Sequence, residues 1–318
     1  MTNIIGIVRF SVLSTKPSPF KAYKDRTFDE IATIILNDQR LARRFHLFET
    51  ICLPSLDAQT DQDFVLYIVA PQLLPEHWKA RLSQLEAGRK YLRVHYADHT
   101  DFTMADISEG VFDLIDQQIF YTFRLDDDDA LTCDFISRIR KSLRDSFVGH
   151  AMSHCRGYYL DMGEAGYRIR HELVPNIATG FGFISSLQKP RTIFDVSEHH
   201  HRFHKWCPVI TDARRPTFLA TTHDANDTGD QRRLDSETIT APEAAKRLRR
   251  TGFNIELELF EKLRISGFDQ NTPVEHNLRE FRSDVREDIY TGLRSLSAQT
   301  QHEIDEELAS RNARHLPV

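Results

Sequence analysis

The sequence has few cysteines, and their spacing excludes several small-protein architectures. Four cysteines occur in 318 residues, at positions 52, 133, 155 and 207, and no two of them form a C-x-x-C pair. A dense disulfide scaffold and a cysteine-based zinc module are therefore both excluded. Scattered cysteines suit a reducing compartment, so we expect a cytoplasmic protein.

Excess basic charge and long apolar runs are missing as well. The chain carries 41 Lys and Arg against 47 Asp and Glu, a net charge of -6, so no overall field attracts nucleic acid. The best apolar stretch, residues 64–74, is broken by Pro71 and falls short of the roughly 18 residues that a membrane-spanning helix needs. Thirteen glycines and twelve prolines are too few for a collagenous chain. We expect a globular protein, soluble or at most peripheral to a membrane, with no nucleic-acid partner.

Segments with strand and helix periodicity alternate through the first part of the chain. Residues 4–10, 64–69 and 91–96 are apolar and β-rich, and helical spacing over residues 28–52 and 75–85 predicts the helices between them. The first of these runs is too short for a signal-peptide core and has no basic region before it, so we interpret it as a strand. This alternation predicts an α/β protein with a mostly parallel, layered sheet.

The second half of the pattern is more mixed. Gly163 and Gly166 predict a turn between two strands, so the sheet becomes mixed there. Beyond about residue 230 the chain is polar and helical, which predicts a domain over residues 1–230 and a helical C-terminal extension over residues 231–318. The further expected elements are helices over 107–119, 241–250 and 285–308, strands over 120–125, 149–160, 166–173, 180–185 and 218–222, and a helix capped by Thr132.

The sharpest feature is a run of four carboxylates, Asp126 to Asp129, at the end of an apolar strand. Adjacent like charges raise one another's pKa and destabilise the site unless a cation or several N–H donors compensate. Oxygen ligands favour Mg²⁺ or Mn²⁺, and open α/β sheets bind ligands at the carboxyl ends of their strands. The alternative is a solvated turn that caps the following helix, although capping requires one carboxylate rather than four.

Several motifs in the sequence resemble a known family. Phe48-x-x-x-Cys52-Leu-Pro-Ser-Leu56-x-x-Gln59-Thr60 resembles the helix and Gln-Thr turn of family 2 nucleotide-sugar glycosyltransferases, and the acidic run resembles their Asp-x-Asp metal motif. More narrowly, a bacterial family described as rhamnosyltransferases is similar over about residues 1–230. The matching motifs are Arg9-Phe10-Ser11, Cys52-Leu53-Pro54-Ser55-Leu56, Arg124-Leu125-Asp126-x-Asp128-Asp129 and His223-x-x-Asn226.

The resemblance implies a GT-A-like (Rossmann-like) α/β fold, with a mixed central sheet flanked by helices. It also implies that the protein binds a nucleotide-diphosphate sugar, and the family description suggests dTDP-rhamnose as this donor. The acceptor would be a glycan or a lipid-linked glycan. Asp126 would lie near the ribose, and Asp126, Asp128 and His223 would hold the metal. The residues implied to bind the donor are Arg9, Phe10, Ser11, Arg124, Asp126, Asp129 and Asn226.

An inverting transfer needs a base that takes the proton of the acceptor hydroxyl. Glu198 is the first candidate, with Asp195 and His200 after it, although Glu198 also suits the first turn of an exposed helix. His200 and His204 are one helical turn apart, which leaves a zinc site as an alternative. Arg43 and Arg44, on the long helix, either meet phosphate or face water, and water is favoured for at least one of them.

Two other functions fit parts of the pattern. A metal-dependent phosphohydrolase would use Asp126–Asp129 together with the histidine cluster at residues 199–204, and a non-catalytic module would bind the sugar nucleotide without turnover. A short basic cluster at residues 246–250 suits either peripheral docking on an anionic membrane or a solvated helix face. The lack of a large apolar face beside it favours the solvated face.

Overall fold

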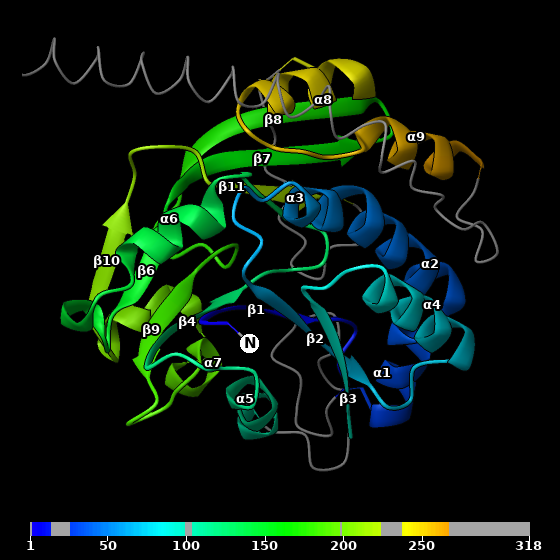
Figure 1. Ribbon diagram of the computed structural model, residues 1–318. Coiled ribbons are helices and arrows are strands. Elements are labelled where there is room, and N and C mark those ends of the chain that lie inside the picture. The colour runs from blue at the N-terminus through cyan, green and yellow to red at the C-terminus, as the bar shows by residue number, and fades with distance from the viewer. Residues whose placement is uncertain (1, 14–25, 99–103, 198, 224–236, 267–318) are drawn as a thin grey trace, which may run out of the picture.

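Two sheets organise the chain in the computed structural model, which describes residues 2–13, 26–98, 104–197, 199–223 and 237–266 (Figure 1). The larger sheet is mixed, because β9 runs antiparallel to both of its neighbours, β4 and β6, whereas the other pairs are parallel. The mixed α/β fold that we predicted is confirmed. In spatial order its strands are β10 (Val209–Asp212), β6 (Ala151–His154), β9 (Gly182–Ser186), β4 (Ile119–Arg124), β1 (Ile4–Arg9), β2 (Val65–Pro71) and β3 (Leu92–Ala97).

Both faces of this sheet are buried, as the continuous apolar run of β1 requires. Ile4 and Val8 pack into the core on one side, and Ile5 and Ile7 pack into the core on the other. Helices supply the rest of each core (Figure 1). The first face is covered by α2 (Asp38–Leu47), α3 (Leu53–Asp57), α4 (Glu76–Ala87) and α6 (Phe135–Ser142), and the second by α5 (Met104–Phe112) and α7 (Ile193–Val196).

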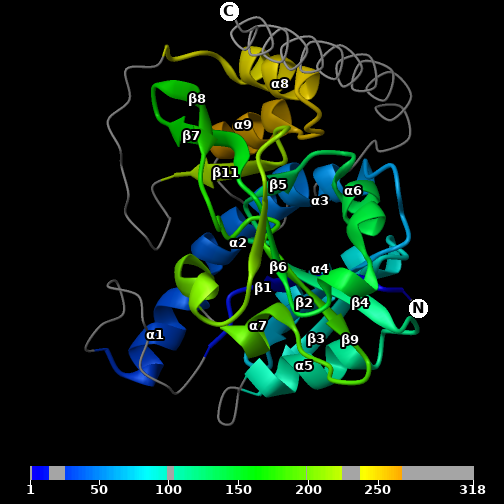
Figure 2. The same cartoon turned by 90° about the vertical axis from the view of Figure 1, so that its left-hand side faces the viewer.

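A second, smaller sheet lies beside the first, and the sequence patterns did not predict it (Figure 2). The hairpin expected around Gly163 and Gly166 is confirmed, and it forms two strands of this sheet. Side chains of α8 (Ala241–Arg250) and α9 (Leu257–Ser266) share one core with these strands, so residues 241–266 pack directly on the domain. In spatial order the strands are β5 (Ala130–Leu131), β11 (Phe218–Thr222), β7 (Arg156–Gly163) and β8 (Gly166–Leu173).

The long helix expected over residues 28–52 is divided into several pieces. It breaks after α1 (Phe28–Ile35), where the side chain of Asn37 accepts a hydrogen bond from the Arg40 amide and starts α2. A π-helical turn, η2 (Phe48–Cys52), then joins α2 to α3, and Pro54 lies in the first turn of α3 rather than after the end of the helix. Proline is tolerated there because the Thr50 carbonyl, which would accept from an amide at position 54 in a regular helix, instead accepts from the Glu256 amide.

Three other boundaries differ from the sequence predictions. Asp134 rather than Thr132 precedes α6, and the Thr132 hydroxyl instead donates to the Asp134 carboxylate. The strand expected over residues 149–160 is divided at Cys155 into β6 and β7, which belong to different sheets. The helix expected over residues 107–119 ends at Phe112. The helix predicted over residues 285–308 lies outside the described residues.

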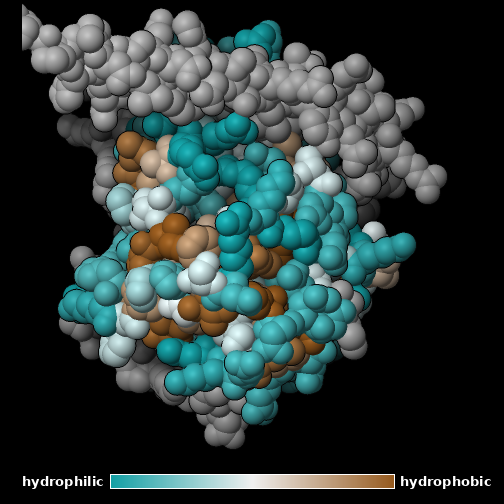
Figure 3. Space-filling view, turned by 60° about the vertical axis from the view of Figure 1, so that its left-hand side comes forward, coloured by the Kyte–Doolittle hydropathy of each residue, from teal (hydrophilic) through white to brown (hydrophobic). Residues whose placement is uncertain are grey.

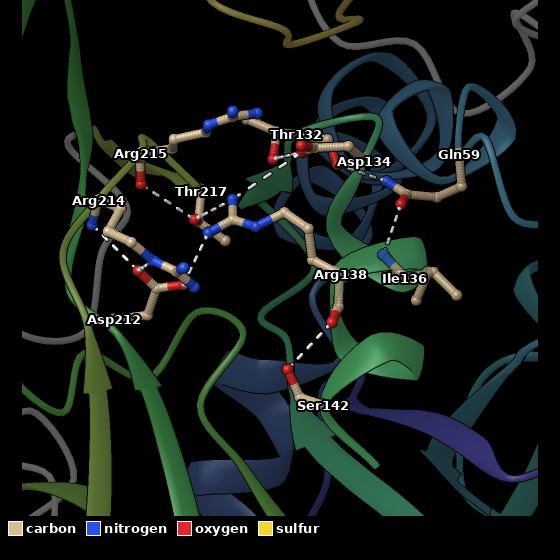
Figure 4. A network of polar contacts seen from close by, with 10 residues as sticks. All are labelled: Gln59, Thr132, Asp134, Ile136, Arg138, Ser142, Asp212, Arg214, Arg215 and Thr217. Atoms are coloured by element: carbon tan, nitrogen blue, oxygen red, sulfur yellow. Dashed lines mark hydrogen bonds and ion pairs between the residues drawn. The ribbon is translucent and has the colours of Figure 1, made fainter. Parts of the chain in front are cut away.

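Polar contacts tie α6 to strands of both sheets (Figure 4). The guanidinium group of Arg138, on α6, donates to Asp212 at the end of β10 and to the Thr217 hydroxyl just before β11. Gln59, in the segment that resembles a Gln-Thr turn, is buried; its amide donates to the Ser55 and Thr132 carbonyls and accepts from the Ile136 amide. Gln59 therefore has a structural role, because it joins the end of α3 to the start of α6.

Apolar residues gather across the middle of the face shown in Figure 3, and hydrophilic residues border them. The large apolar side chains that are most exposed come from separate segments, among them Leu173 on β8 and Trp206 after the 3₁₀ helix η4 (His200–Lys205). A shorter 3₁₀ helix, η3 (Asp145–Phe147), precedes β6. Within the part of the chain that the structure describes, no helix has the length and apolar character needed to cross a bilayer.

We expect Leu248→Ala, a truncation on the buried face of α8, to lower the free energy of unfolding by about 2–5 kcal/mol, because it opens a cavity in the core shared with the second sheet. The loss should appear as one cooperative transition in urea, followed by circular dichroism and tryptophan fluorescence. Lys246→Ala, at an exposed position of the same helix, is the matched control and should change little. Two separate transitions in the wild type would show instead that α8 unfolds independently.

Candidate functional site

The carboxyl ends of β1 and β4 place two cations side by side. These strands are parallel neighbours, with Ile7 opposite Arg124, and Arg9 ends β1. Both guanidinium groups lie over the ring of Phe194 on α7, at 5.1 Å for Arg9 and 4.9 Å for Arg124. The aromatic face stabilises the two like charges close together at the edge where open α/β sheets bind ligands.

The two residues that follow β1, Phe10 and Ser11, are buried. Phe10 is fully buried, and its ring packs edge-on against Phe45 and Phe48, so it supports the site from beneath. Ser11 has a positive φ of 53°, which is uncommon for a non-glycine residue. Its buried hydroxyl has no hydrogen-bond partner among the described residues. A strained residue with an unsatisfied polar group is a feature that functional sites concentrate.

The four carboxylates after β4 have four different environments. Asp126 is exposed, whereas Asp127 is buried in a two-bond ion pair with Arg44 of α2. Asp128 is partly exposed and lies 3.0 Å from the Nε2 atom of His223. Asp129 is buried and accepts hydrogen bonds from the Thr179 hydroxyl and the Thr221 amide. Only Asp126 and Asp128 therefore reach the surface, in the spacing of an Asp-x-Asp pair.

The pKa values of these carboxyls diverge for the same reason. Burial raises the pKa of Asp127 to about 6, although Arg44 opposes the shift. Burial also raises the pKa of Asp129 well above its usual range, and the charges of Asp128 and Asp126 add to this. Burial acts on Asp128 in the same direction, but the hydrogen bond and charge of His223 outweigh it and lower the pKa. Asp128 is thus the carboxylate of these three that the fold keeps ionised most strongly.

His223 reaches the acidic turn because β11 lies against it. The short strand β5 continues from the turn and pairs antiparallel with β11, and the Thr221 hydroxyl on β11 donates to the Asp128 carbonyl. His223 follows β11 directly and is only 5% exposed at its side chain. The sequence separation between His223 and Asp128 is 95 residues, so their contact depends on the pairing of β5 with β11.

The donor set around Asp128 suits a metal that is only partly enclosed by protein. Among the described residues no group of three or more His, Cys, Asp or Glu side chains is arranged to hold a metal ion. Mg²⁺ commonly uses one or two carboxylates and takes its other ligands from substrate phosphates and water. Asp128, with Asp126 beside it on the turn and His223 in contact, fits such a site and does not form a complete protein cage.

The three candidates for the base have different positions. Glu198 lies outside the described residues, as does Asn226 of the donor set. The Asp195 carboxylate caps the start of α7 and accepts from the Thr192 amide and from the Ser108 hydroxyl on α5. His200 is half-buried, and its Nδ1 atom lies 2.5 Å from the Asn176 carbonyl oxygen. The role of each as a base stays a prediction.

The zinc alternative finds no support in the described part of the chain. His200 and His204 lie on η4, a 3₁₀ helix, in which residues three apart rather than four apart share a face. His204 is exposed, whereas His200 turns toward Asn176. The described residues offer no third ligand beside them. The histidine cluster therefore contributes one residue, His200, to the neighbourhood of Arg124 and Arg9.

Cations and paired carboxylates at the carboxyl ends of neighbouring parallel strands form the kind of site that binds nucleoside diphosphates, through a metal and through arginine. The chain belongs to the family described as "Putative rhamnosyl transferase", whose model matches residues 3–234. The family resemblance and the mixed α/β class predicted from the sequence are thereby confirmed, and the chain is a member of a glycosyltransferase family.

Comparison with curated proteins gives no match. Among solved structures, one similar chain is S. aureus TarS 1-349 in complex with UDP-GlcNAc, at 10% identity and a TM-score of 0.41, covering 93% of this chain and 80% of that one. Another is HddC from Yersinia pseudotuberculosis complexed with GMP-PN, at 12% identity and a TM-score of 0.30, covering 69% and 89%. At these TM-scores neither similarity carries an argument about this protein.

Sequence reasoning missed the roles of three residues. The sequence predicts phosphate or water as the partner of Arg44, which instead forms an ion pair with the buried Asp127. Phe194 supports both arginines, and Asn176 fixes the ring of His200. The one sequence signal for the role of Arg44 was Asp127, the carboxylate at the spacer position of the metal motif. A buried Asp at that position requires a cation beside it.

We expect Arg44→Gln to lower the free energy of unfolding by about 1–3 kcal/mol, because it leaves the buried Asp127 carboxylate without its cation while Arg44 itself is partly exposed. Urea denaturation of Arg44→Gln, Asp127→Asn and the double variant forms a double-mutant cycle. The coupling should be roughly 0.5–3 kcal/mol. Additive single effects would mean that the pair contributes nothing to stability.

Proposed function

We propose that this protein is a metal-dependent, inverting glycosyltransferase that moves a sugar from a nucleoside-diphosphate donor to a hydroxyl of a glycan or lipid-linked acceptor. Rhamnose from dTDP-rhamnose is the first donor to test, because the chain belongs to the family described above. The observation that carries the proposal is the contact of Asp128 with His223 at the carboxyl end of β4, beside the exposed Asp126.

The proposed donor site is the edge formed by the ends of β1 and β4. Arg9 and Arg124 supply two positive charges over Phe194, which would offset the charge of a diphosphate. Ser11, two residues after the end of β1, has a buried hydroxyl with no hydrogen-bond partner among the described residues, and this group would be available to the nucleotide. Asp126 and Asp128 approach the same edge from the turn after β4.

Asp128 and Asp126, with His223 adjacent, would hold Mg²⁺ or Mn²⁺ at the donor diphosphate. When bound, such an ion acts as a Lewis acid that stabilises the negative charge of the departing diphosphate. The protein's own contribution is to keep Asp128 ionised and to fix the turn. Asp129 achieves the latter through its bonds to Thr179 and Thr221.

We also propose that the protein works in the cytoplasm. With a lipid-linked acceptor, it would work at the inner face of the membrane. All four cysteines are unpaired, as a reducing compartment requires. The basic cluster on α8 is an unsuitable anchor, because Arg247 pairs with Glu243 and Arg249 pairs with Glu258. Membrane contact would therefore come through the acceptor rather than through this helix.

We expect calorimetric titration of the metal-stripped protein with dTDP, UDP and GDP to show binding of one nucleotide that requires Mn²⁺. Asp128→Asn should weaken this binding at least about tenfold, because an uncharged amide oxygen is a poorer ligand for a hard cation. Circular dichroism checks that the variant remains folded.

Asp116→Asn is the matched control, since Asp116 is an exposed aspartate before the opposite end of β4 and should leave binding unchanged. Metal-independent binding that survives Asp128→Asn would contradict the assignment of the metal site. Binding without transfer or hydrolysis of any sugar nucleotide would support a non-catalytic module. Release of phosphate from simple esters, with no nucleotide bound, would support a phosphohydrolase.

A further inference from the structure

The ring of His200 is held in one tautomer by its contact with Asn176. Its Nδ1 atom lies 2.5 Å from the Asn176 carbonyl oxygen, which is an acceptor only. The proton of a neutral imidazole must therefore be on Nδ1, and Nε2 carries the lone pair. This is the arrangement in which a histidine accepts a proton through Nε2 while a second group fixes its orientation.

The fold imposes the position of that carbonyl. Asn176 has a φ of 56°, in the left-handed region, where asparagine is tolerated better than most residues. Its amide donates to the Ser153 hydroxyl on β6 at 2.8 Å, so the turn is fastened to the central sheet. Residues held in such a conformation cost free energy and cluster at functional sites. The contact to His200 is therefore built on a rigid strand rather than on a loop alone.

Burial, together with the charges that face His200, keeps its imidazole neutral before a substrate binds. Burial lowers its pKa to about 4, and the charges of Arg124 on β4, His201 on η4 and Arg9 on β1 act in the same direction, whereas the bond to Asn176 opposes the shift. At neutral pH the imidazole is therefore uncharged and its Nε2 atom can accept a proton. An anion that binds Arg9 and Arg124 offsets their charges and raises the proton affinity of His200.

We propose that His200 is the base that takes the proton from the acceptor hydroxyl, a deepening that rests on the proposed function. As the hydroxyl oxygen forms its bond to the anomeric carbon, the bond from that carbon to the diphosphate oxygen breaks and the nucleoside diphosphate leaves with the electron pair. The hydroxyl proton moves to Nε2 of His200. Donor binding prepares the base, because the diphosphate charge offsets Arg9 and Arg124.

The placement of Asp195 favours His200 over it. The Ser108 hydroxyl lies 2.8 Å from both oxygens of the Asp195 carboxylate and shares its one proton between them, and one of these oxygens also accepts from the Thr192 amide. If these oxygens took the proton of the acceptor hydroxyl, they would lose the hydrogen bonds that cap the start of α7. That loss would disturb Phe194, whose ring lies against the guanidinium groups of Arg9 and Arg124. Among the described contacts, the Nε2 atom of His200 has no hydrogen bond that proton transfer would break.

The first test compares His200→Gln with wild type in hydrolysis of dTDP-rhamnose, and of UDP- and GDP-hexoses, where water replaces the acceptor. Glutamine can still donate to the Asn176 carbonyl but cannot take a proton. We expect kcat to fall about 10²–10⁴-fold with the donor KM changed less than about threefold. His204→Gln, at an exposed histidine on the same 3₁₀ helix, is the matched control and should retain activity.

The second test needs no turnover. Long-range proton–nitrogen NMR correlations of labelled histidine, with the His200 signal assigned by its loss in His200→Gln, should show the proton on Nδ1. Its pKa should rise by roughly one unit or more when the nucleotide that binds in calorimetry is added. A proton on Nε2 in the free protein, or a pKa that does not respond to the nucleotide, overturns the proposal.

These tests distinguish failure of the base assignment from failure of the proposed function. If the wild type binds a nucleotide and turns over its sugar donor while His200→Gln is equally active, the base assignment is wrong and the proposed function stands. In that event a loss of kcat in Glu198→Gln would identify the base instead. If the wild type binds no nucleoside diphosphate, the proposed function fails, and the base assignment fails with it.

Discussion

A buried carboxylate, Asp129, fastens the end of the central sheet to the second sheet. It accepts hydrogen bonds from the Thr221 amide on β11 and from the Thr179 hydroxyl, and so joins three separate segments of the chain. An unpaired polar group in this position would be costly, so the bonds favour one arrangement of the turn. Because the turn is fixed there, Asp128 meets His223 and the rest of the site can form around that contact.

Four adjacent carboxylates are compatible with a stable fold only because each has a different environment. Arg44 neutralises Asp127 from the helix side, and Asp129 is satisfied by backbone and hydroxyl donors. Asp126 remains in solvent, where its charge is screened. Two of the four carboxyl groups are thus used to hold the turn, and the pair that remains has the spacing that a metal between carboxylates needs.

The site also separates charges of opposite sign. Carboxylates occupy the turn after β4, while Arg9 and Arg124 lie over Phe194 at the strand ends. These groups are on strands or directly after them, and α6 is held against both sheets by Arg138, so the scaffold is rigid (Figure 4). A rigid separation of charge suits the proposed donor, whose diphosphate would interact with a metal on one side and arginine on the other.

The sequence by itself determined the alternation of strands and helices, the hairpin at Gly163 and Gly166, and the acidic turn at a strand end. These features are encoded by neighbouring residues, through side-chain periodicity and turn chemistry. Only the tertiary structure decided which carboxylates are exposed, which tautomer His200 adopts, and that a second sheet exists. The deciding contacts are Arg44 with Asp127, Asp128 with His223 and His200 with Asn176, at sequence separations of 83, 95 and 24 residues. No local pattern specifies contacts at such separations, because they arise only when whole strands and helices pack.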